Sequence, residues 1–171
     1  TYEELYNEKR HTEKVSSFHN SLTLGISQGM NIEQIIETIY STLNVPVLIQ
    51  DLSFNTHQYV GLTEEEFDLL AEDFARQMPQ TRSGKILIQP IDPMHAIQVD
   101  CPNHTRLISP ITVHQQIIGY ISFIYLSKDH NFKEEMNYVQ RSAVCISLWH
   151  LNEKSSLEAI ENIKAFLFEQ L

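Results

Sequence analysis

The chain has 171 residues, of which 42% are apolar and 20% charged, a balance that fits one globular domain with appendages. Its formal charge of −10 repels phosphate, so strong nucleic-acid binding by these residues alone is not expected, and no apolar run reaches the ~18 residues of a membrane helix. No secretory signal accompanies its two cysteines, which predicts free thiols in a reducing cytoplasm.

The first predicted element is a long helix over residues 1–28, polar at first and then marked by an apolar seam. The seam recurs at three- and four-residue steps and consists of Val15, Phe18, Leu22 and Ile26. A helix this polar cannot be buried all round, so the seam should pair with a second helix. That helix is either supplied by a dimer mate or is the C-terminal helix of the same chain. Gly29 is a natural helix stop, so the predicted helix ends there. With its apolar seam, the segment 1–29 is interpreted as a dimerisation helix.

A second helix is predicted from Asn31, whose side chain can form a capping box with Gln34. Its apolar stripe should lie flat on a sheet and comprises Ile32, Ile35, Ile36, Ile39, Tyr40 and Leu43. A strand over 45–49, a turn over 51–55 and a return strand over 56–60 are expected to follow.

Thr63 and Glu66 predict the start of a third helix, which ends at Pro79. Its inner face is expected to comprise Phe67, Leu70, Ala71, Phe74 and Met78. Its acidic residues are interpreted as a solvated face rather than as paired carboxylates for acid–base chemistry: Glu64, Glu65, Glu66, Asp68, Glu72 and Asp73.

Strands are then predicted over 85–89, 95–99, 106–113 and 117–126, with an irregular segment over 90–104 and a polar turn over 114–116. The strand over 117–126 is almost wholly apolar and β-branched or aromatic, which predicts burial on both faces in mid-sheet. Gly119 within it predicts a bulge or a close backbone approach. The helix that follows carries the stripe Met136, Val139, Ala143 and Ile146.

Residues 152–171 are predicted to form a helix that leaves the domain. A mostly polar run gives way there to a renewed stripe: Leu157, Ile160, Ile163, Leu167 and Leu171. An apolar face of this kind is unfavourable when exposed to water, so we expect it to serve dimerisation through Leu157, Ile160 and Leu167. The helix itself is expected to continue toward an effector domain. The chain starts at Thr1 rather than Met, and we expect it to be part of a longer protein.

The run ISPITVHQQIIGYISFIYL, followed by FKEEMNYVQRSAVCISLWHL, resembles the closing hairpin and helix of GAF-type sensory domains. With NIEQIIETIYSTLN, VPVLIQDLSFN and EAIENIKAFLFEQL, it resembles the sensory half of purine-catabolism (PucR) and sugar-diacid (CdaR) regulators over about residues 30–171. The resemblance implies an α+β, GAF-like domain over 30–151. Its central antiparallel sheet would have five or six strands, with helices on one face and long flanking helices. It also implies metabolite sensing or dimerisation, with DNA bound by a separate C-terminal helix-turn-helix domain.

In GAF-like domains a ligand pocket usually lies between the sheet and the irregular segment that crosses it, here 90–104 with the third helix. Polar side chains that could face this pocket are His95, Asp100, Cys101, His104, Arg106 and Ser122. Arg106 offers a planar fork of donors that suits a carboxylate or a purine edge. The alternative for Arg106 is a surface salt bridge to a nearby acid.

Cys101 and His104 have the spacing of a zinc-ligand pair, with His95 six residues before the cysteine. A structural zinc site needs four ligands and the sequence offers no second close pair, so no metal is expected. Free methionine sulfoxide reductases resemble this fold and use clustered cysteines, which Cys101 lacks because Cys145 lies on a helix between two apolar residues. We therefore expect neither catalysis nor a cofactor.

These observations favour the sensory and dimerisation module of a cytoplasmic transcriptional regulator. It would act as a homodimer, with a small metabolite as candidate effector and with DNA contacted only through the further domain. The alternative is the sensor module of a signalling enzyme such as a histidine kinase. A third interpretation, a self-standing redox enzyme, would need thiol activity from Cys101.

Overall fold

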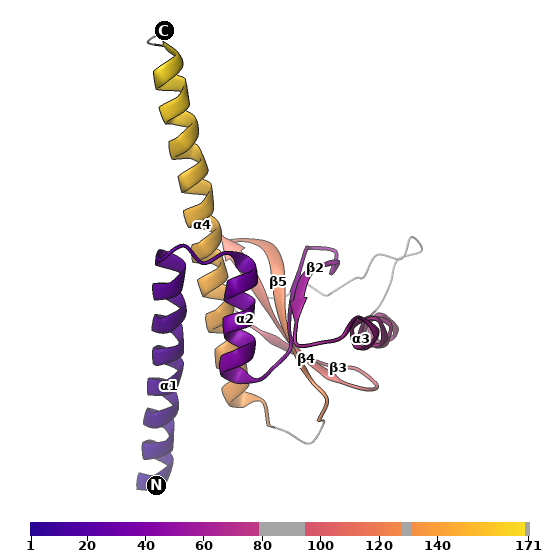
Figure 1. Ribbon diagram of the computed structural model, residues 1–171. Coiled ribbons are helices and arrows are strands. Elements are labelled where there is room, and N and C mark those ends of the chain that lie inside the picture. Colours follow the sequence, from indigo (N-terminus) through magenta and orange to yellow (C-terminus); the bar gives the residue numbers. More distant parts are fainter. Residues whose placement is uncertain (79–94, 128–130, 170–171) are drawn as a thin grey trace.

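The computed structural model describes residues 1–78, 95–127 and 131–169, and these form an α+β fold (Figure 1). In chain order the elements are α1 (Tyr2–Ser27), α2 (Ile32–Leu43), β1 (Val47–Gln50), β2 (Thr56–Val60), α3 (Glu64–Gln77), β3 (Ile97–Asp100), β4 (Thr105–Val113), β5 (Gln116–Tyr125) and α4 (Lys133–Glu169). The predicted fold class is confirmed: a five-stranded antiparallel sheet with long N- and C-terminal helices packed on it. The strand predicted over 85–89 lies outside the described residues.

The sheet has the strand order β2-β1-β5-β4-β3, and every neighbouring pair is antiparallel. The central position of β5 explains its continuous apolar sequence, because both of its faces and both of its edges are covered. The hairpin between β4 and β5 turns through His114 and Gln115, whose φ angles of 51° and 66° match the right-handed twist of the strands.

Both predictions for Gly119, a close backbone approach and a bulge, are confirmed. A Cβ atom at this position would lie 2.6 Å from the backbone oxygen of Gln50 on the neighbouring β1. The register between β4 and β5 also shifts here, between Ile111 and Thr112. Only a residue without a side chain lets the two backbones approach so closely.

The two faces of the sheet carry different helices. Alternate residues such as Val47, Leu107 and Phe123 belong to one large core with α1, α2 and α4. The residues between them point the other way, toward α3, and pack with Leu70 and Phe74. Three helices therefore lie on one face, as the sequence predicts, and α3 is the exception on the opposite face (Figure 1).

The helix starts follow the predicted capping chemistry. The side chain of Asn31 accepts a hydrogen bond from the backbone N–H of Gln34, and Thr63 does the same with Glu66. Both capping boxes are complete, with the glutamine or glutamate side chain accepting a bond from the cap residue's own backbone N–H.

Helices α1 and α4 lie side by side and run in the same direction (Figure 1). His11 meets Asn137 at 3.1 Å, and His19 meets the thiol of Cys145 at 3.5 Å, so one constant offset holds along the pair. The seam of α1 is buried within the chain: Val15, Phe18, Leu22 and Ile26. Of the two predicted partners for this seam, the C-terminal helix of the same chain is therefore the one that the structure shows.

α4 is one continuous helix of 37 residues, and the boundary predicted at 151–152 falls inside it, where the predicted helix leaves the domain. Its first half packs against the sheet through Val139, Ala143 and Ile146. Its second half extends beyond the sheet domain, with exposed apolar side chains at Leu157, Ile160, Ile163, Phe166 and Leu167. None of the helices described has the length and apolar composition needed to span a bilayer.

Candidate functional site

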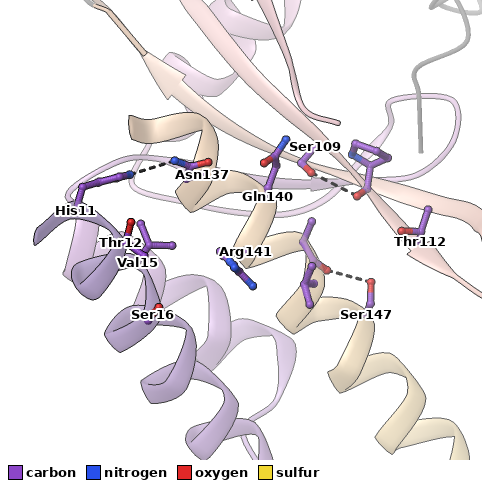
Figure 2. Close-up of a pocket in the computed structure, with 13 residues that line it drawn as sticks. His11, Thr12, Val15, Ser16, Ser109, Thr112, Asn137, Gln140, Arg141 and Ser147 are labelled. Atoms are coloured by element: carbon purple, nitrogen blue, oxygen red, sulfur yellow. Dashed lines mark hydrogen bonds between the residues drawn. The ribbon is translucent and has the colours of Figure 1, made fainter. Parts of the chain in front are cut away.

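A groove of about 540 Å³ lies where α1, α4 and the outer half of β4 meet (Figure 2). Val15, Ala143 and Val144 supply apolar lining. Hydroxyl and amide side chains supply most of the polar lining: Thr12, Ser16, Ser109, Thr112, Asn137, Gln140 and Ser147. The sequence did not indicate this groove, because it exists only once α1 and α4 pack in parallel. The pattern of each helix alone does not reveal which polar residues will face each other.

Arg141 of α4 is the cation of this groove, and Figure 2 shows it between the two helices. Across the described part of the chain, no carboxylate forms an ion pair with its guanidinium. Its field reaches α1, where burial and then the charge of Arg141 lower the pKa of His19. His11, at the end of the groove, contacts Asn137 and lies 3.9 Å from the carboxylate of Glu134.

The six residues predicted to line a ligand pocket do not share one open surface. His95 and Asp100 are exposed, whereas the other four are buried: Cys101, His104, Arg106 and Ser122. Ser122 donates a hydrogen bond to the side-chain oxygen of Gln50 on the next strand, at 2.9 Å. The oxygen of Asp100 accepts bonds from Gln98 and Thr105.

Arg106 has only 1% of its surface exposed, which contradicts the surface salt bridge that was one of the two roles suggested by the sequence. Its Nε donates to His104 Nε2 at 2.9 Å, and a terminal nitrogen donates to the backbone oxygen of Leu70 at 3.1 Å. The guanidinium also lies 4.1 Å from the centre of the Phe74 ring. Burial lowers its pKa to about 10, against the opposing effects of Cys101 and Asp73, so it remains a cation at neutral pH. Arg106 is thus an interior residue that ties β4 to α3.

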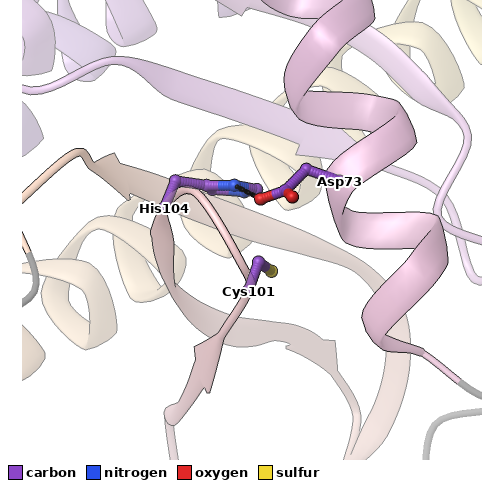
Figure 3. A group of neighbouring side chains, drawn as sticks. All are labelled: Asp73, Cys101 and His104. Atoms are coloured by element: carbon purple, nitrogen blue, oxygen red, sulfur yellow. Dashed lines mark hydrogen bonds and ion pairs between the residues drawn. The ribbon is translucent and has the colours of Figure 1, made fainter.

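Asp73 completes this cluster, and its interpretation as part of a solvated helix face is wrong. It is 3% exposed, and its carboxylate accepts a bond from His104 Nδ1 at 2.7 Å (Figure 3). It also accepts bonds from the backbone and the side chain of Asn103, each at 2.9 Å. Ala71, predicted to face inward, is exposed instead. Burial alone would raise the pKa of Asp73, but the bonds from Asn103 and His104 together lower it. Its spacing of three from Leu70 was the signal available in the sequence.

The donor atoms of Asp73, Cys101 and His104 all lie within 4.8 Å of one another, which invites comparison with a metal site (Figure 3). The hydrogen bonds argue against one. A guanidinium N–H can only donate, so His104 Nε2 must be an acceptor and the ring proton must reside on Nδ1, where it is donated to Asp73. Neither ring nitrogen then offers a lone pair to an ion, and the Arg106 cation lies beside the ring.

The two thiols lie on opposite sides of the sheet. Cys101 belongs to the core under α3, and Cys145 belongs to the core under α1, α2 and α4. Both are buried and free, and burial raises the pKa of Cys145. A pair of this kind cannot act as an attacking and a resolving thiol in one reaction.

No protein-family model matches the chain, and no curated protein matches it at a significant level. The geometry supports an α+β fold with a five-stranded antiparallel sheet flanked by helices, and this is consistent with the GAF-like topology expected from the sequence.

Proposed function

We propose that this chain is the sensory and dimerisation module of a cytoplasmic transcriptional regulator. Its sheet domain would receive a small-molecule signal, and α4 would carry that signal to a DNA-binding helix-turn-helix domain. The observation that supports this best is the apolar face of α4, which continues beyond the sheet domain and is covered by none of the residues that the structure describes. The resemblance of the sequence to sensory halves of GAF-containing regulators supplies the class of protein.

The exposed face of α4 is in register with the buried one. Steps of seven residues lead from Val139 and Ile146 in the core, through Glu153, to Ile160 and Leu167 in the exposed half. A heptad repeat of this kind is the pattern of a helix that pairs with another helix along its length. In the sheet domain the partner surface is α1 and the sheet.

Beyond the domain, α1 no longer covers α4. The constant offset between the two helices places Ser27, the last residue of α1, level with Glu153. From there onward Leu157, Ile160, Ile163 and Leu167 are between 49% and 60% exposed. We propose that the same segment of a second copy covers them in a parallel dimer. Each apolar side chain removed from water contributes ~1.5–3 kcal/mol, so a few from each copy suffice.

Sedimentation velocity at micromolar concentration tests the dimer. The double variant Ile160→Ser/Ile163→Ser should shift the protein toward monomer. Glu158→Ser/Glu161→Ser is the matched control, because it places serines on the outer positions of the same turns and lowers helix propensity at least as much. A wild-type protein that sediments as a monomer, or a dimer that both double variants leave intact, would contradict the role of this face.

The regulatory part of the proposal is tested in the full-length protein. Ile160→Ser/Ile163→Ser should weaken binding to operator DNA in a footprinting assay, and the glutamate control should not. A kinase domain after the α4 segment, in place of a helix-turn-helix, would instead favour the signalling-enzyme alternative.

A further inference from the structure

The groove between α1, α4 and β4 combines a cation with a lining free of acidic residues, and the nearest ion-pair distance is from His11 at its end to Glu134, 3.9 Å away. The sequence contains 22 acidic and 12 basic side chains, yet none of the residues that line the groove is acidic. Arg141 lies in it without an ion pair to any described carboxylate, and His11 lies at its end. We infer that this groove binds a small organic anion through a carboxylate group, with Arg141 as the cationic anchor.

The guanidinium of Arg141 selects the chemical class. Its planar fork of N–H donors matches a carboxylate in two parallel hydrogen bonds, which are charge-assisted and stronger than bonds between neutral groups. The overall charge of −10 would weaken anion binding elsewhere on this surface. An anion that approaches the domain is therefore stabilised where a cation is unpaired and where acids do not line the wall.

The remaining lining indicates the size and polarity of the ligand. The volume of about 540 Å³ is within the range of small-molecule sites. Asn137 and Gln140 can each donate and accept, and Thr12 and Thr112 add hydroxyl groups on two further elements. Val15 and Ala143 provide apolar contact for a short carbon skeleton. The ligand that fits this groove best is a small carboxylate that also carries hydrogen-bonding groups.

The position of the groove gives binding a consequence, which rests on the proposed sensory function. A ligand in the groove contacts three elements at once. It would be held by Arg141 and Gln140 on α4, Thr12 on α1 and Thr112 on β4. It would therefore stabilise one placement of α4 against α1 and the sheet. The same helix continues to the exposed face at Ile160, so the groove and the dimer face are parts of one continuous helix.

Isothermal titration of the 171-residue protein with acetate, succinate and citrate tests the inference. Butane-1,4-diol, the uncharged analogue of succinate, is the control for charge, and inorganic phosphate is the control for anion class. At least one carboxylate should bind, and Arg141→Gln should weaken that binding at least tenfold. Arg141→Lys, which keeps the charge but loses the fork, should be intermediate. Arg76→Gln, an exposed arginine on α3, is the matched control variant and should bind as the wild type does.

NMR titration of His19 provides an independent readout. Arg141 contributes to the lowered pKa of His19, so an anion that neutralises Arg141 should raise that pKa in the wild type but not in Arg141→Gln. Several outcomes overturn the inference: no binding by any of the three carboxylates, equal binding by Arg141→Gln, or phosphate bound as tightly as the best carboxylate. Sedimentation separates this failure from failure of the dimer, because Arg141→Gln leaves Ile160 and Ile163 in place.

Discussion

Asp73 and His104 are 31 residues apart in the chain, and their side chains meet at 2.7 Å in the interior, fastening α3 to the start of β4. The contact continues through the imidazole to Arg106, so an anion, a neutral ring and a cation form one buried chain. Because a buried charge is stable only with its partners, this chain should control how firmly α3 is held on its face of the sheet.

Asp73→Asn should lower the free energy of unfolding by about 3 kcal/mol, because it leaves Arg106 as a buried cation without its balancing charge. Urea denaturation followed by circular dichroism measures the change. Glu72→Gln, next along α3 with its side chain 69% exposed, should stay within about 0.5 kcal/mol of the wild type. Equal effects from the two variants would show that the buried chain contributes no net stability.

The same carboxylate predicts a dependence on pH. The hydrogen bonds from Asn103 and His104 hold the pKa of Asp73 below its ordinary value even though burial opposes them. Its stabilising contribution is therefore complete above the unfolded-state pKa of about 3.9 and is lost as the pH falls through the lower pKa of the folded state. The stability difference between the wild type and Asp73→Asn should shrink when unfolding is measured at about pH 3 instead of about pH 6. A difference that stays constant would mean that Asp73 does not titrate in this range.

Zinc should not be required at Asp73, Cys101 and His104. The proton on His104 Nδ1 and the donor bond from Arg106 occupy the sites that an ion would use. Metal analysis of the purified protein should find well below one zinc per chain, and a chelator should leave the melting temperature unchanged. Stoichiometric zinc that is released only on unfolding would show that the tautomer assigned to His104 is wrong.

Gly119→Ala should destabilise the protein by about 1–3 kcal/mol, because the new Cβ atom would clash with the backbone oxygen of Gln50 and neither strand can move freely. Gly25→Ala is the control within α1. Its Cβ would meet only the flexible end of the Met30 side chain, and alanine favours a helix over glycine. The melting temperature should therefore fall for Gly119→Ala and stay unchanged or rise for Gly25→Ala.

Local chemistry explains why much of the fold could be read from the sequence. Asn31 and Thr63 begin helices through contacts three residues away, and the unbroken apolar run of β5 needs a central strand position. The buried carboxylate could not be found in this way. Asp73 stands among acids that are exposed, and its burial depends on Asn103 and His104, which no local pattern connects to it.

The groove was missed for a related physical reason. Arg141 and Thr12 belong to helices at opposite ends of the chain, and each looks like an ordinary polar residue on an amphipathic helix. Only the parallel packing of α1 on α4, which the seam of Val15 and Phe18 permits but does not dictate, brings them together.

The continuity of α4 has a mechanical consequence. Between Lys133 and Glu169 the helix contains neither proline nor glycine, the residues at which helices most often bend. Ile160 follows Arg141 by about 28 Å along the axis at the usual rise per residue. A small rotation of the helix about its own axis at Arg141 would therefore rotate Ile160 by about the same angle. Residues four positions apart on an α-helix lie about 40° apart around its axis, so a turn of about that size would change which side chains two copies present to each other in the proposed dimer.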